Sequence, residues 1–375
     1  MTNPRKMMMA AAGVSAGGGR LFAWGRNTNG QLGQGNTTST SSPVQVGSDN
    51  TWVHTYGDDE TFFAINEAGE LWTVGDGTDG RTGQGNTTDI SALTQIGSQT
   101  DWLRTDGVGK FSTSEYNVAA IKSTGKLYVW GKNTAGSLGT GNATSLSSPV
   151  QLGAKTDFTY VACAAATSAL ISGGKLYTTG QGYATGRGGS TSYSPVQVGS
   201  QTDWSLLQPT RGGFMGVKTT GKMYTWGYGS QGNLGNGSTS NLNSPVQVGS
   251  LTNWIGSGLT KGHTRYAHVV LKSDGTAWAW GGNYFGILAQ GNRTNTSSPV
   301  QIGSLTTWTH LSSGSITGEQ VAAGIIAGKL YTWGRGSYGG LGHGNTDSLS
   351  SPVQVGSGST WTSIACGKDC MMGIY

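Results

Sequence analysis

The stretch GKLYVWG at residues 125–131 recurs along this 375-residue chain and decides its fold. Six related stretches accompany it: RLFAWG (20–25), GELWTVG (69–75), GKLYTTG (174–180), GKMYTWG (221–227), GTAWAWG (275–281) and GKLYTWG (328–334). The final glycines of successive copies stand 47 to 56 residues apart. A repeat with this spacing predicts a solenoid, a propeller or an array, in which each copy is one structural unit.

Each copy has the pattern of a β-hairpin. In five of the seven copies two aromatic residues stand two positions apart, as Tyr128 and Trp130 do, and therefore lie on one face of a strand. A short apolar run such as 118–121 precedes the copy, and a turn ending in Gly125 connects the two. These alternating runs and turns indicate antiparallel strands.

A glycine-rich loop with the pattern GxLGxG follows most copies, as in residues 27–36 and 133–142. The pattern resembles a phosphate-binding loop, but it lacks both the Gly-Lys-Ser/Thr segment and the helix that such a loop begins. We expect the glycines to adopt positive φ angles and the leucine of the pattern to pack between neighbouring units. These leucines are Leu32, Leu138, Leu234 and Leu341.

The rest of the repeat is a Ser-Pro-Val-Gln segment, present in six of the seven units, followed by an aromatic residue. Proline cannot donate a hydrogen bond within a sheet, so this segment should form an edge strand. The aromatic residue should begin the next unit. Eleven of the 13 tryptophans occupy this position or the one before the final glycine of a copy, which predicts a role in the core.

The two ends of the chain complement each other. Residues 361–375 supply the first two strands of a unit and then stop, whereas Arg20 to Gly25 supply the missing third strand. We therefore expect an all-β, seven-bladed β-propeller over residues 20–375, closed by pairing of the N- and C-terminal strands. Closing a ring of about 340 residues costs roughly 5 kcal/mol of chain entropy, which the strand pairing must exceed.

Composition argues against several classes of protein. Glycine accounts for 66 residues, but 13 Trp and 14 Tyr indicate a packed fold and not a disordered chain. Charged residues make up 11%, and the formal charge of +5 is spread along the chain, which does not indicate a specific nucleic-acid partner. Cys163 and Cys366 occupy matching repeat positions and should be buried core residues; with Cys370 they form neither a disulfide framework nor a zinc spacing.

Residues 1–19 lie outside the repeat. Their apolar run is interrupted by Gly13 and is too short to span a membrane, so we expect neither a membrane span nor a cleaved leader. We predict an arm that anchors the propeller to another protein; a tail folded back on its own propeller is the alternative. The arm residues expected to carry the anchor are Arg5, Lys6, Met7, Met8 and Met9.

The combined pattern LYxWGxNxxGxLGxGNxxxxxSPVQVG, over about residues 20–375, resembles the regulator of chromosome condensation repeat. The resemblance implies a seven-bladed β-propeller. It implies less about function, because the family includes a guanine nucleotide exchange factor that also binds chromatin, a bacterial β-lactamase inhibitor protein, plant photoreceptors and proteins of tailed phages. The Thr/Ser/Asn/Gly-rich composition and the short arm are most similar to the phage and bacterial members.

No convergent set of acids, bases or metal ligands points to an enzyme, so we predict no catalytic residue, no metal site and no cofactor. The five histidines are spread over several units. Asp58-Asp59-Glu60 is the densest acidic run; we expect a solvated turn, with a cation site as the alternative.

Partner surfaces are expected where the repeat is longest. The aromatic residue that opens a unit stands 17 residues before the turn glycine at Trp52, but 23 residues before it at Trp102 and 21 at Trp254. The extra residues should form loops that bind a partner. The candidate partner-binding residues are Lys110, Phe111, Glu115, Tyr116, Lys261, His263, Arg265 and Tyr266.

Lysines beside the hairpin turns should form a basic annulus, which either binds a phosphate-rich surface or serves solubility. These lysines are Lys122, Lys126, Lys175, Lys218, Lys222, Lys272 and Lys329.

The sequence therefore predicts a non-enzymatic structural or binding propeller. Our first hypothesis is a component of a tailed-phage virion, in the tail, a fibre or a decoration, which contacts other virion proteins through the arm and a host surface protein or glycan through its loops. The alternative is a secreted or cytoplasmic inhibitor or regulator that binds one protein, as a β-lactamase inhibitor or an exchange factor would.

Overall fold

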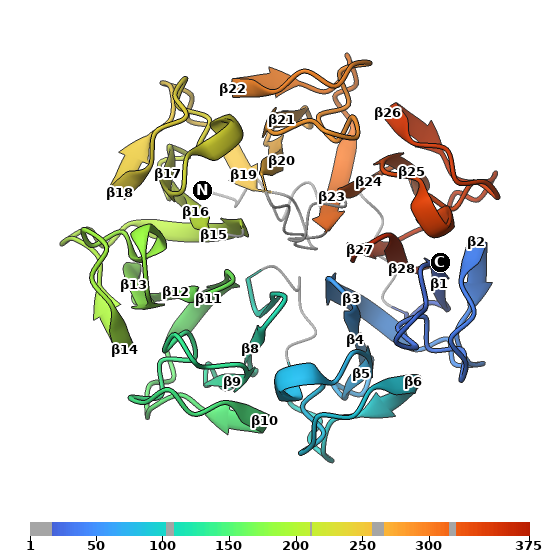
Figure 1. The fold of residues 1–375 in the computed structure, drawn as a ribbon, viewed down its shortest axis with the longest axis horizontal. Helices are drawn as coiled ribbons and strands as arrows, with labels where there is room; N and C mark the ends of the chain where they lie inside the picture. Colours follow the sequence, from blue (N-terminus) through green and yellow to red (C-terminus); the bar gives the residue numbers. More distant parts are fainter. Residues whose placement is uncertain (1–16, 103–108, 211, 257–265, 315–319) are drawn as a thin grey trace.

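The computed structural model describes residues 17–102, 109–210, 212–256, 266–314 and 320–375. Its strands form seven four-stranded antiparallel sheets arranged in a ring (Figure 1). Each sheet is one blade, with its first strand nearest the centre of the ring and its fourth strand outermost. The predicted all-β, seven-bladed propeller is confirmed.

The blades follow the order of the chain. Blade 1 contains β3 (Trp52–Asp58), β4 (Thr61–Asn66), β5 (Leu71–Gly75) and β6 (Ile90–Gln95), and blade 2 contains β7 (Phe111–Thr113), β8 (Asn117–Ile121), β9 (Leu127–Gly131) and β10 (Leu146–Gln151). Blade 3 contains β11 (Phe158–Cys163), β12 (Thr167–Ser172), β13 (Lys175–Gly180) and β14 (Ser192–Gln197). Blade 4 contains β15 (Trp204–Thr210), β16 (Gly213–Lys218), β17 (Met223–Gly227) and β18 (Leu242–Gln247).

The remaining blades complete the ring. Blade 5 contains β19 (Trp254–Gly256), β20 (Ala267–Lys272), β21 (Ala277–Gly281) and β22 (Thr296–Gln301), and blade 6 contains β23 (Trp308–Gly314), β24 (Val321–Ile326), β25 (Lys329–Gly334) and β26 (Leu349–Gln354). Blade 7 joins β27 (Ser363–Cys366) and β28 (Cys370–Ile374) to β1 (Leu21–Gly25) and β2 (Thr40–Gln45). Short 3-10 turns lie in four of the glycine-rich loops: η1 (Thr78–Gly80), η2 (Tyr183–Thr185), η3 (Ser230–Gly232) and η4 (Ser337–Gly339).

Ring closure depends on strand β1. It pairs with β28 along its whole length, from Leu21 opposite Ile374 to Gly25 opposite Cys370. On its other side β1 pairs with β2. The N-terminal strand thus completes a blade whose first two strands come from the C-terminus, as the sequence predicts, and β28 has a partner on both sides.

In four blades the tryptophan of the third strand joins its blade to the preceding one by a hydrogen bond. Trp130 is fully buried, and its indole Nε1–H donates a hydrogen bond to the carbonyl oxygen of Arg81 in blade 1 at 2.8 Å. The same bond joins Trp226 to Ala184 at 2.9 Å, Trp280 to Asn233 at 2.9 Å, and Trp333 to Ile287 at 2.8 Å. These side chains are core residues, as predicted.

The glycine-rich loops pack between blades. Leu32, from the loop of blade 7, is fully buried in a cluster that includes Val74 of blade 1. Gly33 follows it with φ of +70°, and a Cβ atom there would stand 3.0 Å from the side chain of Val46. Both the buried leucine and the left-handed glycines agree with the prediction.

The Ser-Pro-Val-Gln segments form the outermost strands, as predicted. Their valines are about two-fifths exposed, for example 39% at Val44 and 42% at Val150. In the described ranges, no helix has the length and apolar character that a membrane-spanning segment requires.

The predicted basic annulus is wrong for three of its seven lysines, which are buried. The ammonium group of Lys218 lies 5.3 Å from the ring centre of Trp204 and 5.0 Å from that of Tyr224, and 3.1 Å from the carboxylate of Asp203. Lys122 and Lys272 are enclosed in the same way. The tryptophan that opens each of these repeats and an aromatic residue of the third strand present their rings to this position, so these lysines serve packing through cation–π contact.

Deletion of residues 20–25 should lower the melting temperature of the whole domain, because blade 7 would lose its third strand and the outer edge of β28 would be left unpaired. The melting temperature, followed by tryptophan fluorescence, tests this. Val44→Ala on the exposed strand β2 of the same blade is the control and should change stability by less than about 0.5 kcal/mol. An unchanged melting temperature after the deletion would contradict closure by β1.

Candidate functional site

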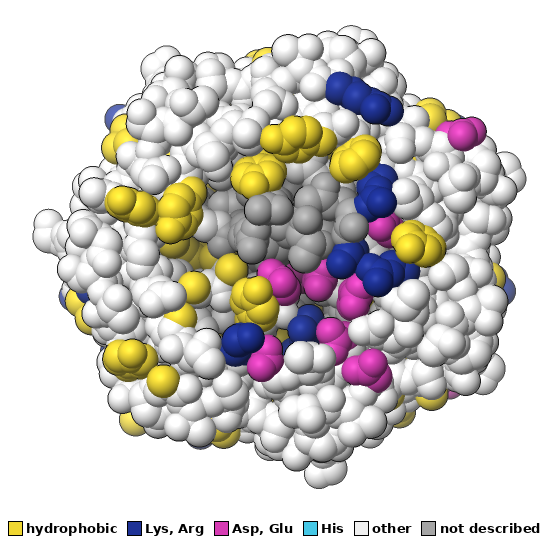
Figure 2. Space-filling view, in the orientation of Figure 1, with side chains coloured by type: hydrophobic (Ala, Val, Ile, Leu, Met, Phe, Trp, Pro, Cys, Tyr) yellow, Lys and Arg dark blue, Asp and Glu magenta, His cyan; other side chains and the backbone are white. Residues whose placement is uncertain are grey.

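One face of the propeller carries most of the variation between repeats. We call it the loop face: it holds the connections from first to second strands and from third to fourth strands. Figure 2 shows this face, with acidic and basic side chains gathered over blades 7, 1 and 2, and hydrophobic side chains over blades 3 to 6. The repeats therefore divide the loop face into two chemically different sectors.

The connection between β3 and β4 lies at the centre of the charged part. Asp58, Asp59 and Glu60 are only 1%, 6% and 8% exposed. The backbone carbonyl of Asp59 accepts a hydrogen bond from the backbone N–H of Lys368 at 2.6 Å, and that of Glu60 accepts one from the N–H of Asp76 at 2.9 Å. The prediction of a solvated turn is wrong, because first strands converge near the axis and the connections of neighbouring blades pack against this turn.

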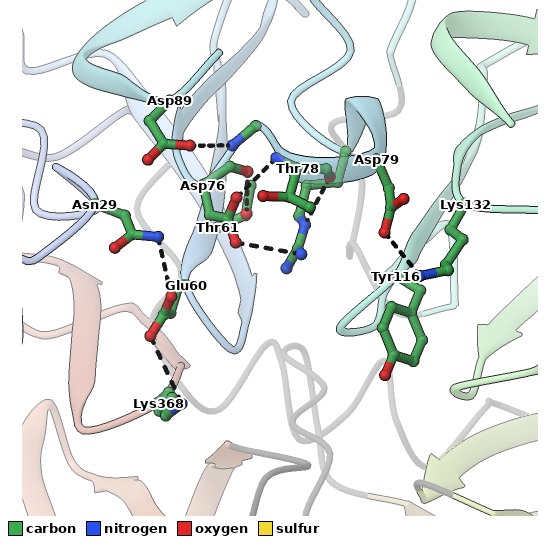
Figure 3. A network of polar contacts seen from close by, with 12 residues as sticks. Asn29, Glu60, Thr61, Asp76, Thr78, Asp79, Asp89, Tyr116, Lys132 and Lys368 are labelled. Carbon is green, nitrogen blue, oxygen red and sulfur yellow. Dashed lines mark hydrogen bonds and ion pairs between the residues drawn. The ribbon is translucent and has the colours of Figure 1, made fainter. Parts of the chain in front are cut away.

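Ion pairs link this turn to its neighbours. Glu60 pairs with Arg26 at 2.6 Å and with Lys368 at 3.7 Å, and its second oxygen accepts a hydrogen bond from Asn29 (Figure 3). Further pairs join Arg81 to Asp76 at 3.2 Å, Lys132 to Asp79 at 3.2 Å and Arg335 to Asp369 at 3.3 Å.

We call this group of side chains the charged sector. It has seven acidic and five basic members: Asp58, Asp59, Glu60, Asp76, Asp79, Glu115 and Asp369, with Arg26, Arg81, Lys132, Arg335 and Lys368.

Burial raises the pKa of three carboxyl groups in the charged sector. Loss of hydration raises the pKa of Asp58 well above its ordinary value, and repulsion from Asp59 adds to the effect. The pKa of Asp59 rises to about 6 through burial and the nearby charge of Glu60. Burial also raises the pKa of Asp369 to about 6, against the opposing effect of Arg335. The sector thus gains negative charge as the pH rises through 6.

Several carboxylate oxygens of the sector lack a hydrogen-bond donor within the described ranges. These are buried oxygens of Asp58, Asp59, Glu115 and Asp369. A buried polar atom without a partner costs about 1 to 3 kcal/mol. The sector can therefore accept hydrogen bonds from groups outside the described residues.

Tyrosines dominate the opposite part of the loop face. Tyr228 is 47% exposed, and its ring lies edge-on to Tyr183 with 5.3 Å between centres. Tyr266 and Tyr284 form a second such pair at 6.1 Å. We call these four residues the tyrosine sector. Sequence analysis named only Tyr266 of this group.

The structure separates the candidate partner-binding residues. Glu115 and Tyr116 lie in the β7–β8 connection of the loop face, where the ammonium group of Lys132 stands 4.7 Å from the ring centre of Tyr116. Tyr266 directly precedes β20, and Lys110 directly precedes β7.

Phe111 corrects the expectation of a loop, because it is 2% exposed in β7 and stacks on Tyr56 with 4.5 Å between ring centres. The candidates outside the described residues are Lys261, His263, Arg265 and the arm residues Arg5, Lys6, Met7, Met8 and Met9.

Sequence analysis missed the residue that directly follows the final glycine of each third strand. That position begins the outer loop, and its side chain varies from blade to blade, with only arginine occurring twice. In blade order from 7 to 6 it holds Arg26, Asp76, Lys132, Gln181, Tyr228, Gly282 and Arg335. Aligning the repeats at this position would have separated the charged blades from the uncharged ones.

Reactive side chains do not converge in the described part of the chain. No group of three or more His, Cys, Asp or Glu residues there is placed to hold a metal ion. Burial lowers the pKa of His268 to about 3 and that of His310 to about 4, which keeps both rings neutral. Cys163 and Cys366 are buried, as predicted, and burial raises the pKa of the Cys366 thiol to about 12.

Sequence comparison finds the regulator of chromosome condensation (RCC1) repeat in five segments, residues 18–57, 124–171, 220–261, 274–316 and 327–374, which together are more than half of the chain. The human E3 ubiquitin-protein ligase HERC2 is 28% identical over 257 residues, which cover 64% of this chain but 5% of that protein. The ultraviolet-B receptor UVR8 of Arabidopsis thaliana is 28% identical over 371 residues, covering 92% of this chain and 80% of the receptor.

Solved structures share the fold. Yeast RCC1 (Prp20), in its complex with Kap60, superposes with a TM-score of 0.81 at 15% identity, covering 98% of this chain and 92% of that one. Human WBSCR16 gives a TM-score of 0.80 at 17% identity, with 95% and 98% covered.

Asp59→Asn should raise the melting temperature at pH 7.5 and have little effect at pH 4. The folded state raises the pKa of Asp59 from 3.8 to about 6, so its protonated form favours folding below pH 4 and that contribution is lost as the pH rises through 6. The gain at pH 7.5 should be about 1 to 3 kcal/mol, and Asn tolerates the φ of +50° at this position.

Asp79→Asn is the matched control. Asp79 shares the left-handed backbone, with φ of 59°, but it is less buried and pairs with Lys132. Its replacement should give no gain at pH 7.5. An equal gain at both pH values for Asp59→Asn would show that its carboxyl does not titrate as described.

Proposed function

The chain belongs to the regulator of chromosome condensation repeat family, and we propose that it is a non-enzymatic binding propeller that docks a protein through the charged sector. In this proposal the partner inserts lysine or arginine side chains between the carboxylates of Asp59, Glu115 and Asp369. The ring of blades holds these carboxylates in fixed positions before the partner arrives.

One observation carries the proposal: buried carboxylate oxygens of the charged sector lack donors within the described residues. The sector has two more acidic than basic side chains, although the whole chain has a formal charge of +5. An ammonium or guanidinium group carries several N–H donors and a positive charge. It can therefore donate hydrogen bonds to the unpaired carboxylate oxygens and balance the excess of acidic side chains. A bound basic side chain would also favour the ionised form of Asp59.

The relatives support a binding role in general terms. One yeast structure is a complex of RCC1 (Prp20) with Kap60, and another concerns the binding of Prp20p to Gsp1p and histones. In both structures Prp20 is 15% identical to this chain, so the likeness concerns the fold. The chain also spans 5% of HERC2, whose ligase activity is therefore no guide to this protein.

The finer proposal is a component of a tailed-phage virion anchored by residues 1–19. It rests only on the Thr/Ser/Asn/Gly-rich composition and on the short N-terminal arm. The relatives reported above are eukaryotic proteins and lend it no support. The soluble inhibitor or regulator is the competing proposal. The arm distinguishes the two, because an assembly subunit needs it for docking and a soluble regulator does not.

Removal of residues 1–19 tests the virion proposal. The full-length and shortened chains are mixed with purified tail and capsid proteins of a tailed phage, and their masses are measured by light scattering after size separation. Virion docking predicts that only the full-length chain enters a large complex. If both chains stay monomeric there and bind one soluble protein equally, the regulator proposal replaces it.

Binding of a basic peptide tests the docking proposal. A fluorescent peptide of alternating Lys and Gly should bind the full chain at pH 7.5, more weakly as salt rises from 50 to 300 mM. The double variant Asp59→Asn, Glu115→Gln should weaken binding at least fivefold, which corresponds to about 1 kcal/mol. The measurement is fluorescence anisotropy.

Two controls make the result specific. Asp347→Asn removes an exposed carboxylate from an outer loop and should leave binding unchanged. A Glu/Gly peptide of the same length should not bind the charged sector. Equal affinity of the wild type and the double variant for the Lys peptide would refute docking at these carboxylates.

A further inference from the structure

The tyrosine sector borders a cavity that the docking proposal does not use. The cavity has a volume of about 600 Å³ and lies between blades 3, 4 and 5 on the loop face. Seven described residues supply its polar and aromatic lining: Thr167, Gln181, Thr191, Tyr228, Ser230, Asn233 and Tyr266. A cavity of 300 to 1,000 Å³ is the usual size for a small-molecule site.

Among the residues that the structure describes, the lining of this cavity contains no Asp, Glu, Lys, Arg or His. Small residues, hydroxyl groups, two amides and two tyrosines make up this described surface. The charged sector, on the other side of the same face, consists instead of acidic and basic side chains together with their ion pairs. Because burying an unpaired charge is costly, this lining favours a neutral ligand with many hydrogen-bonding groups.

Tyr228 offers a flat apolar surface at the cavity. Its ring is 47% exposed and is held edge-on by Tyr183, and its backbone N–H donates to the carbonyl of Gly212 at 3.0 Å. The face of an aromatic ring carries partial negative charge, which attracts C–H groups of positive polarity. The C–H face of a pyranose ring has this polarity and also matches the ring in shape.

Asn233 supplies a hydrogen-bond acceptor that the described residues leave unused. Its side chain is 1% exposed, and its Oδ1 has no donor among the described residues. The backbone of Asn233 is held on both sides, because its N–H donates to the carbonyl of Ser230 and its carbonyl accepts from Trp280. Asn233 lines the cavity, and its buried amide oxygen is an acceptor without a donor among the described residues.

We propose that this cavity binds a neutral saccharide, with one sugar ring stacked on Tyr228 and a hydroxyl group donating to Asn233 Oδ1. Gln181, Thr191 and Ser230 line the same cavity and offer hydrogen bonds to the other hydroxyl groups. The site is independent of the charged sector, so a single propeller presents a protein-docking surface and a glycan-binding cavity on the same face.

An oligosaccharide array tests the proposal. The full chain is applied to immobilised neutral oligosaccharides and to their sialylated or uronic-acid counterparts, and each hit is titrated calorimetrically with the free oligosaccharide and its terminal monosaccharide. We expect binding to neutral members only. If the terminal monosaccharide binds as tightly as the oligosaccharide, a single sugar ring makes all of the contacts. If the monosaccharide does not bind, the cavity recognises more than one sugar ring. An array without a neutral hit overturns the proposal.

Substitutions locate the site. Tyr228→Ala should weaken binding at least tenfold, whereas Tyr228→Phe should keep most of the affinity because stacking remains. Asn233→Ala should weaken binding by a similar factor. Tyr338→Ala is the matched control, since Tyr338 is 50% exposed in η4 of blade 6 and does not line the cavity.

Three measurements on Tyr228→Ala distinguish a loss of sugar binding from a loss of folding or of protein docking: the melting temperature, the affinity for the Lys peptide and the affinity for the glycan. Tyr228 is exposed, so Tyr228→Ala should keep the wild-type melting temperature, and it should bind the Lys peptide normally. Equal affinity of Tyr228→Ala and wild type for the neutral glycan would overturn the proposed site, whatever the outcome for the charged sector.

Discussion

Burial of the third-strand tryptophan against the preceding blade, which occurs in five of the seven blades, is the constraint on which the ring depends. Trp130, Trp226, Trp280 and Trp333 are fully buried, and each donates its indole N–H to a loop carbonyl of the blade before it. A single four-stranded blade could not bury such a ring on its own. Each blade therefore needs its neighbour, and the first needs the last, which is why β1 must reach the C-terminal strands.

A ring joined in this way leaves the loop face free to vary. The residue after each third strand can be Arg26, Asp76, Gln181 or Tyr228 without change to the contacts between blades. Neighbouring blades carry side chains of a similar kind at equivalent positions. Charged side chains therefore gather on one side of the loop face and hydrophobic side chains, including the tyrosine sector, on the other (Figure 2). The fold supplies the positions, and the side chains supply the chemistry.

Sequence reasoning succeeded for the repeat core and failed for charged residues near the axis. Spacing of Trp, Leu and Pro predicts strands, edges and closure, because these depend on local periodicity and on apolar burial. Asp58 to Glu60 and Lys218 looked solvent-exposed because charged residues in turns usually are. Convergence of first strands buries the acidic turn, and rings from two strands enclose Lys218. Phe111 was assigned to a loop because the extra residues before β7 hide its place in the strand.

The sequence by itself determined the number of blades, the order of strands within each and the pairing of its two ends. Each of these follows from a pattern repeated seven times, so the evidence accumulates along the chain. Only the tertiary structure decided which side chains meet. Arg26, Glu60 and Lys368 come from distant parts of the chain but lie together because blades 7 and 1 are neighbours. The cavity beside Tyr228 and Asn233 likewise arises where separate blades abut, and no local pattern encodes it.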